Sequence, residues 1–321
     1  MTGVGAGANG ILIASGPWDP NPWAEMVRKL MPGRPVFIWP DLPDPAAVRY
    51  LLAWHPPEAA LAALPDLAVI FSLGAGVEHI LSRRNLPDVP VARIVSDDLT
   101  GRMVEWITLQ VLLHHRQQRR YDRLQRERRW HELTQPAATE VRVGVMGMGV
   151  IGAAAAEILA RLGFRVAGWS RTPKAVEGIE AFHGAAGLDA FLARTDILVV
   201  VLPHTPETHG LLAMPLFRKL APDGALGGPI LINAGRGLLQ VEADIVRAIE
   251  EGVLIGASLD VFEAEPLDPT SPLWGLDDVV VTPHAAGWCD PRELVRQIAG
   301  QIEAYEAGRP LRNVVDRKAH Y

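Results

Sequence analysis

Apolar residues recur in short runs through the first hundred residues, and polar or proline-rich segments separate the runs. A run of four or five apolar residues bounded by turn residues is typical of a buried β-strand. Strands are predicted on this basis at residues 10–14, 36–39, 50–54, 68–71 and 92–95. Because the segments between them are long enough for crossover helices, the pattern indicates a parallel α/β sheet.

The same alternation continues in the second half of the chain. Strands are predicted in a run that ends at Gly147 and at residues 164–169, 196–202, 229–232, 256–261 and 279–281. Apolar residues at helical spacing predict helices at 153–162, 189–194 and 291–307, and a long helical segment without proline at 100–130. The 321 residues suffice for two α/β domains.

Three glycines lie where a predicted strand is followed by a predicted helix. Gly147, Gly149 and Gly152 form the pattern G-x-G-x-x-G. In a dinucleotide-binding turn the first glycine permits the tight turn, the second admits the pyrophosphate, and the third lets helix and strand pack closely. The helix N-terminus offers N–H groups to the phosphates. We therefore predict a dinucleotide site; the alternative is a glycine-rich turn that binds nothing.

The end of the next strand indicates which dinucleotide binds. An Asp or Glu at this place accepts a hydrogen bond from the ribose 2′-hydroxyl of NAD. Ser170 stands there instead, and Arg171 follows it. A hydroxyl and a guanidinium suit a 2′-phosphate, which a carboxylate would repel. The sequence thus predicts NADPH in preference to NADH, with Lys174 as a further cation, unless Arg171 is an ordinary solvated loop residue.

Composition narrows the class of protein. Apolar residues make up 49% of the chain, and the net charge of −6 gives no overall footprint for nucleic acid. The single cysteine, Cys289, excludes an internal disulfide and fits a reducing compartment. The apolar run at 11–14 is too short for the core of a signal peptide, and no run is as long as a membrane helix. We expect a soluble, cytoplasmic protein without a membrane partner or a metal site.

Arginine is concentrated in the second half of the long helical segment. The arginines there are Arg116, Arg119, Arg120, Arg123, Arg126, Arg128 and Arg129. A nucleic-acid patch is one interpretation. Because the chain as a whole is acidic, a solvated helix face or a contact between subunits is favoured, and no nucleic-acid partner is expected.

A glycine-rich loop follows a predicted strand in the first part of the chain. Its sequence is Ser-Leu-Gly-Ala-Gly-Val-Glu, residues 72–78. The glycines leave backbone N–H groups uncovered, which suits an anion such as a carboxylate. An ordinary β–α turn has the same composition, so both interpretations stay open.

Residues suited to catalysis follow three consecutive predicted strands. Arg236, Glu265 and His284 each come shortly after a strand, and the carboxyl ends of neighbouring parallel strands meet at one crevice. Arg236 can hold a carboxylate and a carbonyl through its planar fork. His284 can donate a proton, and Glu265 can bind its other ring nitrogen and orient it. Together they suit the reduction of a carbonyl, although each by itself is more often a surface charge or a structural residue.

Five motifs in order resemble the D-isomer-specific 2-hydroxyacid dehydrogenase family, over nearly the whole chain. They are G-M-G-V-I-G, L-P-H-T-P-E-T, N-A-G-R-G, D-V-F-E-A-E-P-L and T-P-H-A-A. The loop S-L-G-A-G-V-E-H, the upstream Y-L-L-A-W-H-P-P and the Ser170–Arg171 pair are most similar to the glyoxylate/hydroxypyruvate reductase A branch. The resemblance implies a flavodoxin-like substrate domain, 1–100 and 288–321, with a Rossmann nucleotide domain, 101–287, inserted in it. Both are doubly wound parallel-sheet domains.

The resemblance also assigns roles. Arg236 corresponds to the substrate-binding residue, His284 to the proton donor and Glu265 to the partner of that histidine. Asp260 resembles the residue near the nicotinamide carboxamide. The loop for the substrate carboxylate is Leu73, Gly74, Ala75 and Gly76. Further cofactor-binding positions are Gly147, Met148, Gly149, Val150, Ile151, Gly152, Leu202, Pro203, Thr208 and Ala234. Family members are usually homodimers joined through a helical arm, which gives the arginine-rich segment an interface role.

Two departures from the branch pattern concern the substrate pocket and a nearby loop. Gly-Trp-Cys-Asp stands at 287–290, where reductase A relatives have a Thr-Arg pair, and His204 stands where Asn is common. Trp54, with Trp39 or Trp288 as alternatives, is a candidate to cap a small substrate by apolar contact.

The predicted activity is the NADPH-dependent reduction of small 2-keto acids, glyoxylate and hydroxypyruvate first, to D-2-hydroxy acids by a homodimer. A reductase for bulkier 2-keto acids is an alternative. A cofactor-sensing scaffold that binds protein partners, as the C-terminal-binding corepressors do, is another, although all three catalytic positions are filled. Phosphite oxidation also fits these residues, whereas formate enzymes of the family have Gln at the position of Glu265.

Overall fold

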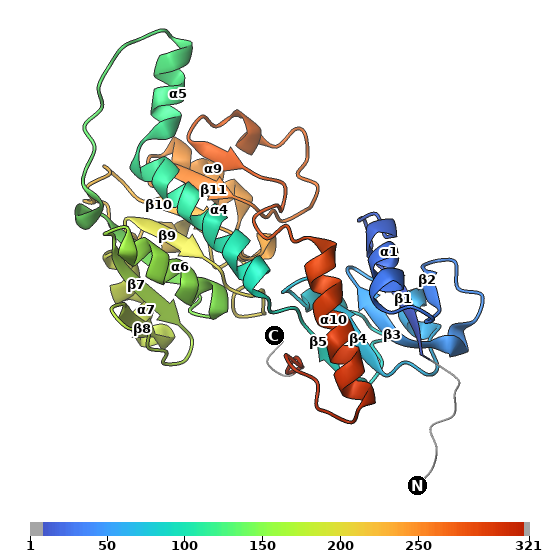
Figure 1. Ribbon diagram of the computed structural model, residues 1–321. Coiled ribbons are helices and arrows are strands. Elements are labelled where there is room, and N and C mark those ends of the chain that lie inside the picture. Colours follow the sequence, from blue (N-terminus) through green and yellow to red (C-terminus); the bar gives the residue numbers. More distant parts are fainter. Residues whose placement is uncertain (1–8, 318–321) are drawn as a thin grey trace. The chain divides into compact units, whose positions relative to one another are not determined.

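The computed structural model describes residues 9–317 and divides into two compact units (Figure 1). Unit 1 is formed by the two ends of the chain, up to Asp98 and from Cys289 onward. Unit 2 is the continuous segment Leu99–Trp288. Each unit has its own parallel sheet, which confirms the predicted fold class. Within residues 9–317, no helix is both long and apolar enough to cross a bilayer.

Unit 1 is built on a five-stranded parallel sheet of order β2-β1-β3-β4-β5. Its strands are β1 (Gly10–Ala14), β2 (Val36–Ile38), β3 (Val48–Ala53), β4 (Val69–Ser72) and β5 (Val91–Ala92). Its helices are α1 (Asn21–Leu30), α2 (Glu58–Ala62), α3 (Glu78–Leu81) and α10 (Pro291–Glu306), with a 3-10 turn at Pro45–Ala47. This strand order is that of the flavodoxin-like fold.

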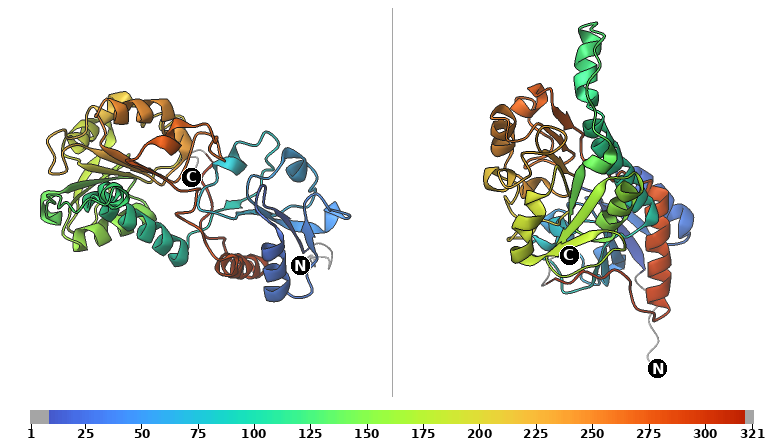
Figure 2. Two further views of the ribbon diagram at one scale, coloured as in Figure 1. Left: turned by 90° about the horizontal axis from the view of Figure 1, so that it is seen from above. Right: turned by 90° about the vertical axis from the view of Figure 1, so that its left-hand side faces the viewer.

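Helices α1 and α10, from opposite ends of the chain, pack side by side against this sheet (Figure 2). The fully buried Tyr50 donates to Glu306 at the end of α10, with 3.0 Å between the oxygens. Arg34 forms an ion pair with the same carboxylate at 2.5 Å. Burial and the hydrogen bond to Glu306 raise the pKa of Tyr50 to about 12, so the phenol stays neutral and holds the last turn of α10 on the sheet.

Unit 2 is built on a seven-stranded parallel sheet of order β12-β11-β10-β9-β6-β7-β8. Its strands are β6 (Arg142–Met146), β7 (Arg165–Ser170), β8 (Glu180–His183), β9 (Ile197–Val200), β10 (Ile230–Asn233), β11 (Gly256–Leu259) and β12 (Val279–Val281). Its helices are α4 (Asp97–His115, which begins in unit 1), α5 (Gln118–Arg126), α6 (Val150–Arg161), α7 (Gly184–Ala193), α8 (Met214–Phe217) and α9 (Glu242–Glu250). Short 3-10 turns lie at Ala138–Glu140, Gly237–Leu239 and Pro272–Gly275. Successive strands are added on one side of β6 up to β8 and on its other side from β9 onward. Sheets of this kind bind nucleotides at the switch point, here between β6 and β9.

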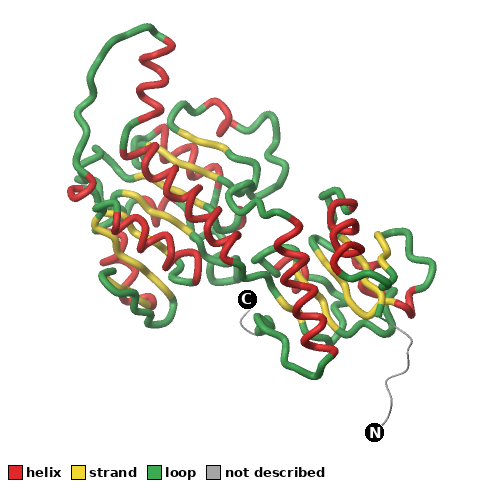
Figure 3. Tube along the Cα trace, viewed as in Figure 1, coloured by secondary structure: helices red, strands yellow, loops and turns green. Residues whose placement is uncertain are grey.

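The long helical segment predicted at 100–130 is wrong as one element. The chain forms α4 and then α5, and Gln117 between them has a left-handed backbone with φ of 54°. Three arginines of α5 contact the loop before β12: Arg119 donates to the carbonyl of Asp277 at 2.9 Å, Arg123 pairs with Asp278 at 3.2 Å and Arg126 with Asp277 at 3.7 Å. After α5 the chain returns to β6 along an extended loop (Figure 3).

A buried polar chain joins α4 to β11. Ser258 donates its only proton to Gln110 at 2.9 Å, so its oxygen accepts from Nε2 of His114 at 2.8 Å. A Cβ at Gly256 would lie 3.0 Å from the His114 ring, so this glycine makes room for it. Burial, with a smaller contribution from Arg119, lowers the pKa of His114 to about 4. The ring is therefore neutral in the folded protein at physiological pH.

The lowered pKa of His114 leads us to expect that acid destabilises unit 2. An unfolded histidine takes up a proton near pH 6.5, whereas folded His114 does so only near pH 4, so stability falls as pH drops through this window. The linkage amounts to about 2 kcal/mol between pH 7 and pH 5. Urea unfolding at the two pH values is expected to show a smaller pH dependence for His114→Gln than for wild type. His183→Gln, at an exposed position on β8, is the matched control and should behave as wild type. Equal pH dependence in all three proteins would contradict the assignment.

Candidate active site

The glycine-rich turn joins β6 to α6 at the point where the strand order reverses. Gly147 has φ of 110°, and a Cβ there would lie 2.9 Å from the carbonyl carbon of Val201. A Cβ at Gly152 would lie 1.9 Å from the carbonyl oxygen of Gly147, so the helix start and the strand end need glycine at both positions. A Cβ at Gly149, the N-cap of α6, would meet nothing within 4 Å. The turn therefore has a closed side and an open side, and the open side fits a pyrophosphate.

The remaining residues of this turn divide between packing and exposure. The side chain of Met148 is buried against β7. A Cβ placed at Gly168 of β7 would lie only 2.4 Å from the Met148 sulfur. Val150, the first residue of α6, is 55% exposed, and Ile151 is half-buried. Met148 thus contributes packing through its side chain, so only its backbone can face a ligand.

Ser170 is the last residue of β7, so no carboxylate stands at this strand end. Its buried hydroxyl donates to the carbonyl of Thr172 at 2.8 Å. That bond engages the only hydroxyl proton of Ser170 in this structure. Arg171 and Lys174, both exposed in the loop that follows, are the cations of this corner. The corner has positive charge where a 2′-phosphate would lie.

The loops after β9 and β10 contact each other. Leu202 is buried, and a Cβ at Gly235 would lie 2.8 Å from its carbonyl oxygen. Thr208 closes the β9 loop, since its hydroxyl donates to the carbonyl of Pro203 at 2.9 Å and accepts from the N–H of Thr205 at 2.8 Å. Thr208 therefore shapes this loop, and Ala234, buried directly after β10, lies next to Gly235.

The turn that holds Arg236 is fixed by an amide network. The side chain of Asn233 accepts from the N–H of Gly235 at 3.0 Å and donates to the carbonyl of Arg236 at 3.2 Å. A Cβ at Gly237 would lie 1.7 Å from the carbonyl oxygen of Phe262, so the turn presses directly on the loop after β11. Burial lowers the pKa of Arg236 and nearby Glu265 opposes this shift, but a guanidinium remains charged at neutral pH.

Glu265 and His284, from the loops after β11 and β12, form a hydrogen-bonded pair. Nδ1 of His284 lies 2.8 Å from Oε2 of Glu265, and the other carboxylate oxygen accepts from the N–H of Phe262 at 3.1 Å. Burial acts to raise the pKa of Glu265, but its bonds to His284 and Phe262 and the charge of Arg236 outweigh burial and leave the pKa lowered. A carboxylate only accepts, so Nδ1 bears the hydrogen in this bond.

Asp260 holds the turn that contains His284. One of its carboxylate oxygens accepts from the Thr282 hydroxyl at 2.5 Å and from the N–H of Ala285 at 2.9 Å, and the other accepts from the N–H of Ala286 at 2.9 Å. The backbone N–H of His284 donates to the Asp260 carbonyl at 2.8 Å, and His284 has φ of 52°. This left-handed conformation costs on the order of 1–3 kcal/mol in a non-glycine residue and persists only where its surroundings enforce it.

That positioning role was not predicted from the sequence. Asp260 was assigned a place near the nicotinamide, and the only signal for a second role was its position directly after a buried strand. Burial raises its pKa while the three hydrogen bonds and His284 oppose the shift. Both carboxylate oxygens of Asp260 are thus engaged with the turn that presents His284.

In unit 1, the loop 73–76 follows β4 and is tightly folded. The buried hydroxyl of Ser72 donates to the carbonyl of Gly76 at 2.9 Å and accepts from the N–H of Gly74 at 3.3 Å. Leu73 is buried, whereas Gly74 and Ala75 are half-buried. Trp54 lies against this loop, because a Cβ at Gly74 would be 2.5 Å from its ring carbon Cζ3.

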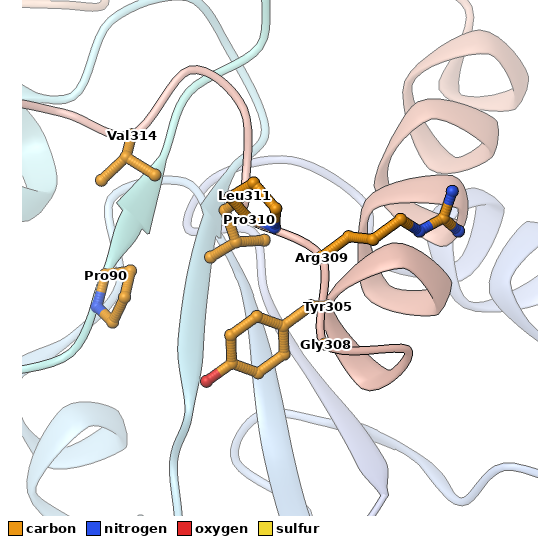
Figure 4. Close-up of a pocket in the computed structure, with 7 residues that line it drawn as sticks. All are labelled: Pro90, Tyr305, Gly308, Arg309, Pro310, Leu311 and Val314. Atoms are coloured by element: carbon orange, nitrogen blue, oxygen red, sulfur yellow. The ribbon is translucent and has the colours of Figure 1, made fainter.

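Two other features lie away from these residues. A cavity of about 480 Å³ lies beside the end of α10 in unit 1, lined by Tyr305, Leu311 and Val314 among others (Figure 4). None of the predicted site residues lines this cavity, so it is not part of the candidate active site. Among residues 9–317, no group of three His, Cys, Asp or Glu side chains could hold a metal ion.

Comparison with known proteins agrees with this architecture. Residues 108–286 match the family model described as D-isomer specific 2-hydroxyacid dehydrogenase, NAD binding domain. The chain is similar to the NADPH-dependent glyoxylate/hydroxypyruvate reductase of Sinorhizobium meliloti, solved with NADP and sulfate: 46% identity over 98% of this chain and 100% of that one, TM-score 0.93.

Two further solved structures are also similar. A probable 2-hydroxyacid dehydrogenase of Rhizobium etli, in complex with NADP, HEPES and L(+)-tartaric acid, shares 46% identity over 97% of this chain and 99% of that one, TM-score 0.91. A D-isomer specific 2-hydroxyacid dehydrogenase of Xanthobacter autotrophicus, in complex with NADPH and MES, shares 42% identity over 98% of this chain and 100% of that one, TM-score 0.91. The predicted family resemblance is confirmed. The chain belongs to the D-isomer specific 2-hydroxyacid dehydrogenase family and is an NAD(P)-dependent oxidoreductase.

Proposed function

We propose that this enzyme reduces glyoxylate and hydroxypyruvate to D-2-hydroxy acids with NADPH. The observation that supports this most directly is the pair of Glu265 and His284, 2.8 Å apart and electrostatically coupled to Arg236, at the ends of three neighbouring strands. A cation, a proton donor and an orienting carboxylate are what carbonyl reduction requires. The 46% identity to a glyoxylate/hydroxypyruvate reductase supports the choice of substrates.

Each of the three residues has a distinct role in this proposal. Arg236 binds the carboxylate and carbonyl of the substrate and stabilises the negative charge that develops on the carbonyl oxygen. Protonated His284 gives the proton on Nε2 to that oxygen. Glu265 holds Nδ1 and keeps the ring in the orientation needed for the transfer.

The reaction balances with one hydride and one proton. Bound reduced nicotinamide supplies the hydride to C2 of the 2-keto acid. The C=O double bond becomes a C–O single bond, and its oxygen takes the proton from His284. The neutral ring then recovers a proton from solvent while Glu265 remains ionised. Unit 2 binds the cofactor through Gly147, Gly149 and the N-terminus of α6. Unit 1 binds the substrate carboxylate through the backbone N–H groups of loop 73–76.

NADPH is the proposed cofactor because the β7 end offers cations and no carboxylate. We expect Arg171→Asp to lower the ratio of kcat/KM with NADPH to kcat/KM with NADH by about 10- to 100-fold, the worth of one charge-assisted hydrogen bond. Steady-state kinetics with both cofactors measures the ratio. Arg165→Asp, an exposed arginine at the opposite end of β7, is the matched control. An unchanged ratio in Arg171→Asp would show that this loop does not bind the 2′-phosphate.

Substitutions at two glycines of this turn are expected to have different effects, one on NADPH affinity and the other on stability. Because Gly149 has space for a Cβ and an ordinary φ of −80°, Gly149→Ala should fold normally but lose NADPH affinity, by about 10-fold or more, since the methyl group lies where the pyrophosphate binds. Gly152→Ala instead drives a Cβ into the backbone at Gly147 and should cost about 3 kcal/mol or more of stability. Thermal unfolding without cofactor separates the two. A stable Gly152→Ala, or a Gly149→Ala variant with normal NADPH affinity, contradicts this description of the turn.

A homodimer is proposed through the arm formed by α4, α5 and the following loop. Leu109 on α4 is 57% exposed, and Trp130 in the loop is fully exposed. Burial of these two side chains against a second copy of the chain would remove apolar surface from water and favour association. We place the enzyme in the cytoplasm because its single cysteine suits a reducing compartment.

A substrate panel tests the proposed function. The protein is mixed with NADPH or NADH and with glyoxylate, hydroxypyruvate, pyruvate or phenylpyruvate, and loss of reduced cofactor is followed by absorbance. Turnover of glyoxylate and hydroxypyruvate with NADPH preferred is the expected result. Turnover of phenylpyruvate alone would overturn the substrate assignment. Tight NADPH binding without turnover of any acid would favour a cofactor-sensing scaffold.

A further inference from the structure

The carboxyl edge of the unit 1 sheet has its own ligand position. In the order β2-β1-β3-β4-β5, β2 is added on one side of β1 and the later strands on the other, so the switch point lies between β1 and β3. Open α/β sheets bind ligands in the crevice at such a point. The loop after β1 contains Trp18, the residue after β3 is Trp54, and the loop after β4 is 73–76. Two indole rings thus belong to the loops that border this crevice.

The two indoles stack on each other. The rings of Trp18 and Trp54 lie 4.4 Å apart at an interplanar angle of 9°, and Trp23 of α1 continues the stack at 6.3 Å from Trp18. His79 packs on Trp54 with ring centroids 4.2 Å apart. Trp54 is therefore held between two rings and cannot turn away unless one of them moves.

The stack ends on the substrate-binding loop. The six-membered ring of Trp54 covers Gly74, where a Cβ would lie 2.5, 3.2 and 3.3 Å from three of its carbons. Trp54 is 7% exposed, whereas Trp18 is 40% exposed. The inner indole, Trp54, thus forms a wall beside the loop, and the outer indole, Trp18, lies nearer solvent.

We propose that Trp18, acting through Trp54, limits the substrate to 2-keto acids whose side chain is no larger than a hydroxymethyl group. This inference rests on the proposed function, because it takes loop 73–76 as the place where the substrate carboxylate binds. Trp54 is the contact residue and Trp18 is a positioning residue. The stacked faces of the two indoles are apolar, so removal of Trp18 opens space for an apolar side chain such as benzyl.

Trp18→Ala tests the inference, since an exposed side chain can be truncated with little risk to the fold. The ratio of kcat/KM for phenylpyruvate to kcat/KM for glyoxylate, with NADPH, is expected to rise about 10- to 100-fold. Trp18→Phe keeps a ring on Trp54 and should restore a ratio near that of wild type. Trp274→Ala removes a tryptophan that is 55% exposed in unit 2 and should leave the ratio unchanged.

The outcomes separate this inference from the proposed function. If wild type reduces glyoxylate and hydroxypyruvate but Trp18→Ala loses activity on all acids equally, the stack is merely structural and the inference is wrong. Failure of Trp18→Phe to restore the ratio has the same meaning. A wild type that already prefers phenylpyruvate overturns both. As a second readout, D-phenyllactate should raise the Tm of Trp18→Ala more than that of wild type, whereas D-glycerate should not; equal shifts count against the stack as a size limit.

Discussion

Replacing His284 with Gln is expected to lower kcat for glyoxylate reduction by about 10²- to 10⁴-fold, the usual contribution of a positioned general acid. The proposed proton donor is the imidazole ring, which Glu265 orients through the 2.8 Å bond to Nδ1. Gln has no proton that it can transfer at neutral pH. Binding of NADPH, measured by fluorescence titration, should change little, since the turn of Gly147, Gly149 and Gly152 is untouched.

Two companion variants make the measurement specific. Glu265→Gln keeps a hydrogen-bonding group beside the ring but loses the charge, so kcat should fall by less than in His284→Gln. His209→Gln replaces an exposed histidine that contacts His204 and should retain wild-type kcat. If His284→Gln kept kcat within a few fold of wild type, another group would have to be the acid. A loss in His284→Gln that is matched by lost NADPH binding would instead indicate a folding defect.

Much of the fold could be predicted because its strands are buried on both faces. A strand with buried residues throughout, such as Gly10–Ala14 or Ile197–Val200, appears in the sequence as an unbroken apolar run. β8, Glu180–His183, was missed because it is an edge strand with mostly exposed residues, which leaves no apolar pattern. The strand predicted at 92–95 is only Val91–Ala92, because the N–H of Arg93 donates to the carbonyl of Asn313 at 3.0 Å and not to a neighbouring strand.

The break between α4 and α5 was not visible for a different reason. Neither proline nor glycine marks it, and Gln117 takes its left-handed backbone without a residue type that favours it. The arginines of α5 then pair with Asp277 and Asp278, far along the chain. Such a tertiary contact leaves no periodic signal in the sequence.

The candidate site likewise has features that the sequence could predict and features that it could not. Proximity of Glu265 and His284 was predictable, since residues after neighbouring parallel strands share one edge of the sheet. The Asp260 bonds to Ala285 and Ala286 were not, because they depend on the left-handed turn at His284. Nor could composition show that the Ser170 hydroxyl donates to the carbonyl of Thr172.

Arg236→Gln is expected to lower kcat/KM for glyoxylate by about 10²- to 10³-fold, the range found when one partner of a desolvated charge pair is removed. Burial of the Arg236 guanidinium lowers its pKa. Because buried charges are poorly screened by water, this charge should act strongly on a bound carboxylate. Gln keeps two N–H donors but has neither the charge nor the planar fork.

Arg236→Lys separates these two properties. Lysine restores the charge as a single point, so it should recover part of the loss in KM but little of the loss in kcat, because bidentate alignment of the carboxylate and carbonyl is absent. Arg218→Gln, at an exposed arginine of unit 2 paired with Glu251, is the control for a simple change in net charge and should behave as wild type. Full recovery by Arg236→Lys would mean that charge alone matters. If Arg236→Gln itself kept wild-type kcat/KM, the substrate would have to bind elsewhere. The guanidinium also donates to the carbonyl of Gly235 at 2.6 Å, and both variants alter this bond. The bonds of the Asn233 side chain to the Gly235 N–H and to the Arg236 carbonyl do not involve the guanidinium and should still hold the turn, which unchanged thermal unfolding of both variants would verify.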